Sequence, residues 1–501
     1  MLLIKDIKLD INADEVDLRN CIEKKLKTQI NSFEIYRKSL DARKVPIYVY
    51  SVLVRVDNED KYLRKDVVKF KKEDLNPKYV ERGITCAVIG YGPSGIFSAY
   101  RLTEAGFKVK VFEKGKRINE RVKDVEKFFN SGILDENSNV QFGEGGAGTF
   151  SDAKLTTRIK DKYIEYILDV FIKHGAKKSI KYENHPHIGT DEVRKIISNI
   201  TDYLISKGCE FHFEEPVEEF IIDDQEIKGI VTKKDKYLCD YVLLGIGHSA
   251  YSTILKLKQS GVYVESKDMA IGFRVEHPQS LIDSNQTNGL VNEANEYFLR
   301  YKGDKGVYSF CMCPGGIVIP AMSDKNTVVT NGMSYSNRDS GIANSAILIQ
   351  LPQSEFEDGY DYLHEKESLA YNYSNSYKAL AQNIKDFMSN ELNELIFKST
   401  YPLDTVLYDF NNFFSKDDVR IIKKAMLDFD RKIPGFIKQG IMVGPETRSS
   451  SPVRIKRNES LVSVSTRNLY PMGEGSGYGG GIMSCALDGI RIANRIILNH
   501  E

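Results

Sequence analysis

A glycine turn near residue 90 is the first stretch of this sequence whose residue types suggest chemistry. Gly90, Gly92 and Gly95 follow an apolar run and precede a helix-like pattern, an order that predicts a buried strand, a tight turn and a helix. Gly90 would permit the turn, Gly92 would let a pyrophosphate approach the backbone, and Gly95 would let the helix pack closely on the strand. A second predicted strand over 108–112 ends in Glu113, about where dinucleotide-binding folds place a ribose-binding carboxylate. The stretch therefore predicts a dinucleotide site.

A second glycine-rich loop lies near the other end of the chain. It contains Gly473, Glu474, Gly480 and Gly481, and Ile482 begins a long predicted helix. A helix N-terminus offers unpaired N–H groups and a positive dipole end, so it suits a region of negative charge. Two such loops in one chain resemble the FAD-dependent oxidoreductases with two dinucleotide motifs. That resemblance implies FAD as the cofactor, with Glu474 bound to its ribityl or phosphate region and Gly480 to Ile482 facing the pyrimidine edge of the flavin.

Five further runs extend the resemblance over nearly the whole chain. They are 142–152, 185–191, 310–316, 331–334 and 448–452. These runs are similar to those of a family known only as FAD-dependent dehydrogenases or NAD(P)/FAD-dependent oxidoreductases. The names give no substrate. Ala153 stands where the family pattern leads us to expect glycine, a departure that puts little in doubt.

The resemblance implies further contacts with FAD. Gly146 and Gly148 would offer backbone amides to the flavin or the phosphates, and Ser151 would bond to the flavin ring. Arg121 would lie near the pyrophosphate, and Val217 would meet the adenine through its backbone. Each contact has a plainer alternative, because a glycine loop can be a surface loop and a basic residue beside a helix usually faces solvent.

The run 241–250 admits two interpretations. A strand followed by Gly245, Gly247 and Ala250 could be a second fingerprint, for NAD(P)H, with Glu265 as its acid. The resemblance favours another interpretation, in which this strand returns to the first sheet and Gly247 touches FAD. We favour the second, because no independent βαβ unit of the needed length surrounds the run.

Cys311 and Cys313 form a Cys-x-Cys pair. In a strand both thiols would face the same side, where they could be a redox pair, half of a metal site or a substrate-facing thiol. The spacing is not the Cys-x-x-Cys of zinc sites, and no second pair completes a four-thiolate site, so we expect no metal. Buried apolar thiols are the plainer alternative. Cys311 remains a candidate for catalysis.

Two other side chains are candidates for catalysis. His187 could donate a proton, because imidazole titrates near neutrality. Its neighbours His185 and Asp191 would also suit zinc, but flavin chemistry needs no metal. Arg448 could clamp an anionic substrate or stabilise reduced flavin. A hydrogen-bonded structural histidine and an ordinary ion pair are the plainer alternatives.

The composition bounds the function. The chain has 501 residues, with 70 lysines and arginines against 70 aspartates and glutamates. The formal net charge of zero provides no basic field for nucleic acid or for an anionic membrane. No apolar run is long enough to span a membrane, and seven scattered cysteines indicate thiols in a reducing cytoplasm. We therefore expect a cytoplasmic protein that binds neither nucleic acid nor membrane.

The predicted fold is α/β, a Rossmann-like FAD-binding domain with two additions. Residues 1–80 would form a small α+β, ferredoxin-like domain and a charged linker. Residues 81–250 and 445–501 would form the two parts of the FAD-binding domain. Residues 251–444 would form an inserted α+β substrate or cap domain, with one helix expected over 368–391.

The expected function is that of an FAD-dependent oxidoreductase or dehydrogenase. It would transfer hydride between the flavin and an unidentified small molecule, either unsaturated or carbonyl-conjugated. NADH or NADPH could serve as electron donor, and a redox protein could be a partner. The alternative is a flavoprotein that modifies RNA or uses FAD only as a scaffold. The zero net charge argues against RNA.

Overall fold

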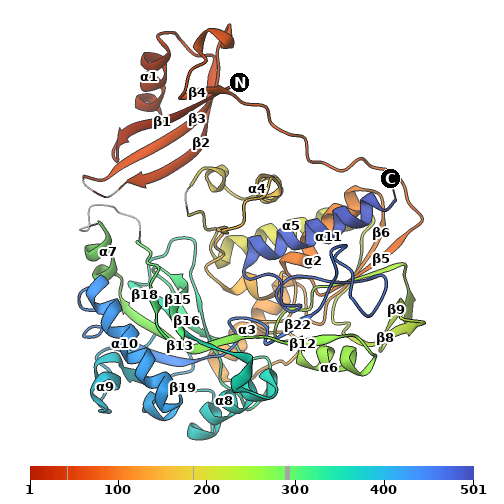
Figure 1. The fold of residues 1–501 in the computed structure, drawn as a ribbon, viewed down its shortest axis with the longest axis vertical. Coiled ribbons are helices and arrows are strands. Elements are labelled where there is room, and N and C mark those ends of the chain that lie inside the picture. The colour runs from red at the N-terminus through yellow and green to blue at the C-terminus, as the bar shows by residue number, and fades with distance from the viewer. Residues whose placement is uncertain (42, 44, 184, 288–293, 501) are drawn as a thin grey trace.

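The structure, a computed structural model, describes residues 1–500 except 42, 44, 184 and 288–293. Figure 1 shows a small N-terminal domain above a larger body, joined to it by a long extended segment. The larger body contains one region built around a parallel sheet and another built around an antiparallel sheet. The α/β class predicted from the sequence is confirmed.

The N-terminal domain packs one helix on a four-stranded antiparallel sheet with strand order β2-β3-β1-β4. Leu18, Ile22 and Leu26 recur at helical spacing and are buried against the strands, which fixes the face that the helix presents. The predicted β-α-β-β order is present, and a fourth strand completes the sheet. Its elements are β1 (Leu2–Asp10), α1 (Glu15–Leu26), β2 (Ser32–Asp41), β3 (Ile47–Arg55), η1 (Glu59–Tyr62) and β4 (Val67–Lys69).

Residues 70–84 form the extended connection to the larger body. Ion pairs fasten it along the way, Lys72 to Asp169 at 2.8 Å and Glu73 to Lys162 at 2.6 Å. These pairs are largely exposed, so each contributes little on its own. The charged stretch predicted as a linker therefore lies along the surface of the larger body.

The parallel sheet carries the first glycine loop at the carboxyl end of its central strand. Its strand order is β23-β11-β5-β6-β7. Helices α2 and α11 pack closely against each other: a methyl group on Gly489 would lie 2.2 Å from the Ser94 carbonyl oxygen. The elements are β5 (Thr85–Ile89), α2 (Pro93–Glu104), β6 (Lys108–Phe112), α3 (Ile118–Ser131), η2 (Gly146–Phe150), α4 (Tyr163–Lys173), η3 (Lys178–Lys181), α5 (Thr190–Ser206), β7 (Glu210–His212), β11 (Tyr241–Leu244), β23 (Leu469–Pro471) and α11 (Ile482–Leu498).

The run 241–250 belongs to this same sheet. β11 pairs with β5 on one side and with β23 on the other, so Gly245 and Gly247 follow a strand of the first Rossmann sheet. Glu265, the acid of the rejected interpretation, lies in β12, which pairs with β22. Within the described residues the run forms no βαβ unit of its own. The second interpretation is therefore confirmed in its topology.

A small antiparallel sheet and a two-stranded ribbon complete this region. The antiparallel sheet has the order β10-β9-β8, and α6 packs beside it. The elements are β8 (Val217–Asp223), β9 (Glu226–Thr232), β10 (Lys236–Leu238), α6 (Tyr251–Gln259), β12 (Val264–Ser266) and β22 (Val453–Ile455). Because β12 pairs with β22, residues 251–266 lie with the dinucleotide region, not with the cap to which the sequence assigned them.

The cap is a seven-stranded sheet of order β14-β15-β18-β13-β21-β19-β20, antiparallel except for the β19–β20 pair. β21 (Ile441–Glu446) is fully buried in it and crosses the predicted boundary at 444. The other elements are β13 (Met269–Pro278), α7 (Gln279–Thr287), β14 (Arg300–Lys302), β15 (Gly306–Cys313), β16 (Ile317–Pro320), β17 (Thr330–Met333), β18 (Ile342–Leu351), η4 (Gln353–Glu355), α8 (Gly359–Ser374), β19 (Ala379–Asn383), α9 (Ile384–Ser389), β20 (Thr405–Leu407), η5 (Phe410–Asn412) and α10 (Lys416–Lys432).

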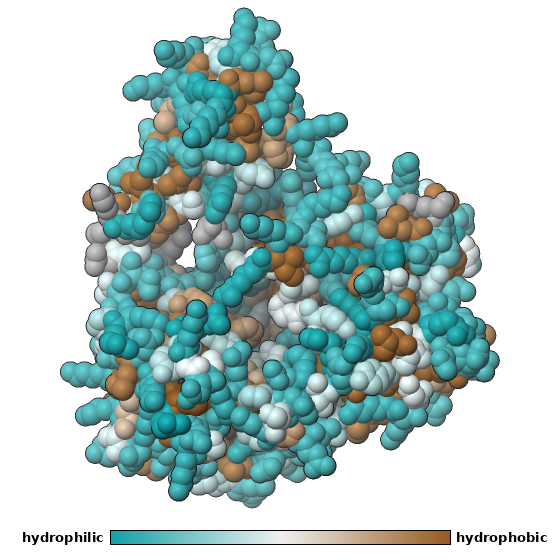
Figure 2. Space-filling view, in the orientation of Figure 1, coloured by the Kyte–Doolittle hydropathy of each residue, from teal (hydrophilic) through white to brown (hydrophobic). Residues whose placement is uncertain are grey.

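The single helix predicted over 368–391 is wrong. α8 ends at Ser374, and Ala379–Asn383 forms a strand whose five residues are all buried between β20 and β21. Burial in the sheet overrides the helical pattern of the flanking residues. The face of the molecule shown in Figure 2 is mostly hydrophilic, with apolar residues in small scattered groups.

Candidate functional site

One cavity of about 420 Å³ brings the two glycine loops together. Its walls come from the carboxyl ends of the parallel strands, from the loop 141–154 and from four segments of the cap side. Ligands of open α/β sheets bind at this edge, where loops diverge beyond the strand ends. The cap contributes Cys311, Asn331, Glu446 and Arg448 to the walls.

The first glycine loop has no room for side chains. A methyl group on Gly90, whose φ is +86°, would lie 2.4 Å from the Gly245 carbonyl oxygen. One on Gly146, whose φ is +63°, would lie 2.8 Å from the Cα of Gly92. The backbone of the turn at 90–95 and the backbone around Gly146 thus approach each other with no side chain between them. One on Gly95 would lie 2.1 Å from the Gly90 carbonyl oxygen, which explains this glycine by helix packing, as predicted.

Glu113 ties this backbone together. Its carboxylate accepts hydrogen bonds from the N–H groups of Tyr91 at 2.8 Å, Gly115 at 2.9 Å and Gly143 at 2.9 Å. The side chain is buried and also lines the cavity. Four lone-pair positions on a carboxylate leave room for a further donor, such as a ribose hydroxyl. Glu113 therefore organises the loop in addition to offering the acceptor predicted from its position.

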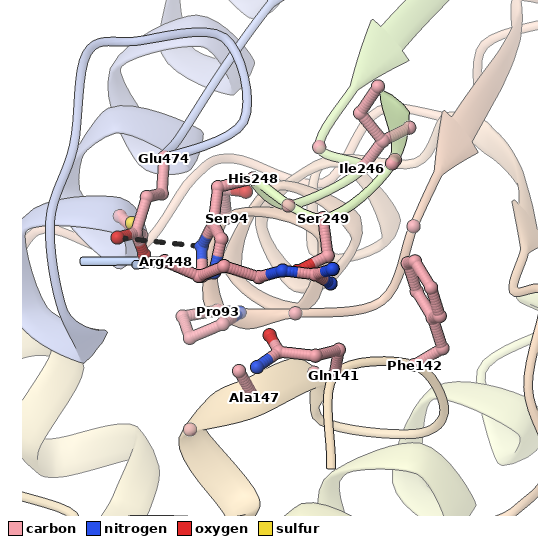
Figure 3. A pocket seen from close by; sticks show the side chains of 18 of the residues that line it. Pro93, Ser94, Gln141, Phe142, Ala147, Ile246, His248, Ser249, Arg448 and Glu474 are labelled. Carbon is pink, nitrogen blue, oxygen red and sulfur yellow. Dashed lines mark ion pairs between the residues drawn. The ribbon is translucent and has the colours of Figure 1, made fainter. Parts of the chain in front are cut away.

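The second loop is held from behind by an ion pair. Asp488 accepts from the Gly473 N–H at 2.8 Å and pairs with Arg457 at 2.6 Å. Glu474 extends from this loop toward the cavity, and its carboxylate lies 3.7 Å from Nδ1 of His248 (Figure 3). The Nε2 of His248 is buried and has no hydrogen-bond partner among the described residues.

Two helix N-termini open on the cavity without side-chain caps. Gly92 precedes α2 and Gly481 precedes α11, and neither residue can accept from the first N–H groups of its helix. Both glycines line the cavity. Uncapped N–H groups and two positive dipole ends suit a ligand with two separate regions of negative charge. The bare glycine cradle and this pair of helices fit FAD, which has a pyrophosphate and an electron-rich pyrimidine edge.

The cavity brings together most of the residues predicted from the sequence. Four predicted cofactor residues, Gly95, Arg121, Gly473 and Gly480, are not among the residues that line the cavity. The predicted residues that line the cavity are Gly90, Gly92, Glu113, Gly146, Gly148, Ser151, Val217, Gly247, Cys311, Arg448, Glu474, Gly481 and Ile482.

Arg121 lies outside the cavity walls, contrary to its predicted place beside the pyrophosphate. Its guanidinium is fully buried and donates to the carbonyl oxygens of residues 139, 140 and 144 and to the Thr149 hydroxyl. Arg121 therefore stabilises the loop 141–154, which contains the glycines at 143, 145, 146 and 148. Lys114 is one of the basic residues that do line the cavity, and its Nζ lies 4.2 Å from the centroid of the Phe142 ring. Burial lowers the pKa of Lys114.

Arg448 lines the cavity but is already paired. Its guanidinium donates to Glu367 at 2.9 and 2.7 Å, to Asp324 at 2.7 Å and to the Ser323 hydroxyl at 2.5 Å. Glu367 is only 1% exposed and lies in α8 of the cap. Two carboxylates face one guanidinium, so this group carries a net negative charge. An anion clamp at Arg448 would have to displace one of these partners.

His187 lies beside the cavity, not in its wall. Burial and the charge of Arg338 lower the pKa of His187, and its buried Nε2 has no hydrogen-bond partner among the described residues. Arg338 itself pairs with Asp152 at 2.6 Å, and Asp152 lines the cavity. His187 therefore lies near Arg338 and Asp152 behind this wall and does not itself line the cavity.

The structure adds Glu446, which sequence reasoning missed. Glu446 is buried, lines the cavity and lies 3.2 Å from Arg274. Burial raises its pKa to about 7, against the opposing charge of Arg274. A carboxyl group with such a pKa can hold or release a proton near neutrality. No motif marks it, because its place beside Arg274 results from the pairing of β21 with β13, two strands far apart in the sequence.

The fold and the cavity define a dinucleotide-binding protein of the FAD-dependent class. Residues 268–449 match a family model described as "FAD-dependent protein, C-terminal domain-like", and residues 1–55 match a domain of unknown function. An uncharacterized protein of Clostridium beijerinckii is 39% identical over 527 aligned positions, covering 99% of this chain and 98% of that protein. The chain belongs to the same family as this relative. The resemblance to FAD-dependent proteins predicted from the sequence is confirmed.

Solved structures with similar folds are more distant. A geranylgeranyl bacteriochlorophyll reductase-like protein from Thermoplasma acidophilum is 12% identical, with a TM-score of 0.37 over 83% of this chain and 79% of that one. L-proline dehydrogenase from P. horikoshii is 11% identical, with a TM-score of 0.36 over 84% of this chain and 94% of that one. No helix in the described part of the chain is long and apolar enough to cross a membrane.

Proposed function

We propose that this chain binds FAD non-covalently and is an oxidoreductase that transfers hydride between the flavin and a small organic molecule. The substrate class that we propose is unsaturated or carbonyl-conjugated. The observation that carries the proposal is the pair of uncapped helix N-termini, at Gly92 and Gly481, on one cavity. When bound, FAD supplies a ring that accepts or gives a hydride.

The residues of the chain would position the substrate and manage protons. The cap forms one wall through Asn331, Glu446 and Arg448, so that a substrate placed there is shielded from bulk water. Glu446 is the group that would hold or release a proton at its carboxyl oxygen, because burial raises its pKa to about 7. Arg274, 3.2 Å away, keeps the ionised form of Glu446 accessible.

The partners that the proposal requires are the small-molecule substrate and an electron donor. NADH, NADPH or a redox protein would fill the second role. The balanced charge of the chain supports the proposal that neither nucleic acid nor a membrane is a partner. The cytoplasm, where thiols stay reduced, is the compartment that the seven free cysteines favour.

The test starts with the flavin of the purified protein, released by heat and identified by mass. Anaerobic titration with NADH and with NADPH then follows the loss of flavin absorbance, and a substrate screen follows its return. We expect FAD at one per chain, and reduction by one of the two donors or by a redox protein. Extraction of FMN, or a failure to take up flavin on reconstitution, would refute the proposal.

A matched pair of glycine variants ties the result to the cavity. Gly146→Ala pushes a methyl group to 2.8 Å from Gly92, whereas Gly261→Ala, at a φ of +84°, meets open space outside the cavity. Both variants carry the strain of a left-handed alanine, about 1–2 kcal/mol. Only Gly146→Ala should weaken FAD binding. Bound FAD with no reduction by any donor would favour the alternative of a structural flavin.

A further inference from the structure

Two thiols beside the cavity have no part in the function proposed above. Cys311 lies in β15 at a bulge, where the pairing with β18 shifts between Phe310 and Cys313. Its φ of +43° is a left-handed conformation that a non-glycine residue adopts only at a cost of about 1–2 kcal/mol. A bulge changes the direction in which side chains point. Here Cys311 is half-buried and lines the cavity, whereas Cys313 is buried and does not line it.

Hydrogen bonds couple the two thiols to each other and to Arg274. Nη2 of Arg274 donates to the Cys311 carbonyl oxygen at 2.7 Å and lies 3.6 Å from Cys313 Sγ. The Cys313 thiol donates a hydrogen bond to the same carbonyl oxygen at 3.3 Å. The neighbouring Cys313 side chain, together with the charges of Arg274 and Lys154, lowers the pKa of Cys311 against the effect of burial. The same contact and burial raise the pKa of Cys313.

The other five cysteines lack this arrangement. Cys86, Cys209 and Cys485 are buried, and burial raises the pKa of each thiol. Cys21 and Cys239 are half-buried and lie away from the cavity walls. Cys485 also lines the cavity, but among the described residues only Cys311 combines that position with a second thiol that donates to its own carbonyl oxygen.

We propose that Cys311 and Cys313 are a redox-active dithiol that reduces a low-molecular-weight disulfide admitted to the cavity. This activity does not rest on the hydride transfer proposed above. The Cys311 thiolate attacks one sulfur of the external disulfide, whose S–S bond breaks and releases one thiolate. The Cys313 thiol gives its proton to that thiolate, attacks the Cys311 sulfur and releases the second thiolate. The dithiol has then lost two electrons, and the external disulfide has gained them.

The recess of Cys311 selects a small partner. The thiol is half-buried in the cavity wall, a position that favours a small disulfide over the disulfide of a folded protein. A neutral, flexible disulfide such as bis(2-hydroxyethyl) disulfide is the probe of choice. Excess 2-mercaptoethanol should reverse the reaction, because exchange is an equilibrium.

The test treats the full chain, with whatever flavin it retains, with this probe and maps the cysteines by mass. Wild type should form a Cys311–Cys313 disulfide, two hydrogens lighter than the dithiol. Cys313→Ala should stop at a probe adduct on Cys311, and Cys311→Ser should leave residue 313 unmodified. Cys21→Ser, a control outside the cavity, should behave as wild type. Modification confined to Cys21 and Cys239 would overturn the proposal.

A second measurement is independent of whether the Cys311 variants fold. The rate of iodoacetamide alkylation of Cys311 in wild type, followed against pH by peptide mass, should rise with a midpoint below pH ~7.5, against about 8.5 for an ordinary thiol. In Cys313→Ala, the loss of the thiol donor should raise that midpoint. An unchanged midpoint in this variant, or a wild-type midpoint at about 8.5, would overturn the assignment of Cys311 as the attacking thiolate.

Discussion

Replacing Arg448 with alanine should lower the free energy of unfolding of this protein, whatever its effect on the reaction. The guanidinium makes two charge-assisted hydrogen bonds with Glu367, at 2.9 and 2.7 Å. Glu367 is 1% exposed, and within the described part of the chain its carboxylate accepts one other hydrogen bond, from the Thr447 hydroxyl at 2.7 Å. Alanine would leave this carboxylate buried without a counter-charge. Breaking a buried pair on one side costs about 3–5 kcal/mol, so we expect a loss of that size in the free energy of unfolding.

A double variant separates this loss from a role in the reaction. Arg448→Met together with Glu367→Gln removes both charges and keeps similar volumes, a change that is often close to neutral. We expect the double variant to regain most of the stability, within about 1–2 kcal/mol of wild type. If the guanidinium also acts on the substrate, turnover in the double variant should stay at least about tenfold low, equivalent to about 1.4 kcal/mol.

Urea unfolding followed by circular dichroism measures the stability of each variant, and steady-state kinetics with bound flavin measures turnover. A stability of Arg448→Ala within about 1 kcal/mol of wild type would refute the argument from the buried carboxylate. Wild-type turnover in the double variant would show that Arg448 serves only to neutralise Glu367.

Three further outcomes follow from the cavity. Glu113→Ala leaves the N–H groups of residues 91, 115 and 143 without their acceptor. FAD affinity, measured by fluorescence titration, and stability, measured by urea unfolding, should therefore each fall by roughly 1–3 kcal/mol. An unchanged dissociation constant would place the ribose contact elsewhere. Gly146→Ala should weaken FAD binding at least about tenfold relative to Gly261→Ala, and equal affinities would show that the glycine cradle does not hold the cofactor. The folded pKa of Glu446, about 7, lies above the ordinary value of about 4.3, so its stability contribution is complete below pH ~4.3 and is lost as pH rises to about 7. The stability of wild type relative to Glu446→Gln should therefore fall over that range, and a difference independent of pH would contradict the raised pKa.

The sequence predicted the dinucleotide region well because its signals are local. The glycines at 90 and 95 must occur where the backbone bends or packs too tightly for a side chain, and the structure shows those contacts. The run at 241–250 was also assigned correctly, because a missing βαβ unit is visible in the sequence itself. Arg121 was misplaced because its spacing does not reveal that four acceptors from the loop surround it.

The sequence by itself determined the α/β class, the two glycine loops and the acids that follow them, since each depends on residues close together in the chain. The tertiary structure decided what the cap contributes. It paired Arg448 with Glu367, raised the pKa of Glu446 by burying it, and turned a Cys-x-Cys spacing into a bulged pair with one thiol at the cavity. These properties depend on burial and on charges brought together from distant segments, and local spacing carries no record of either.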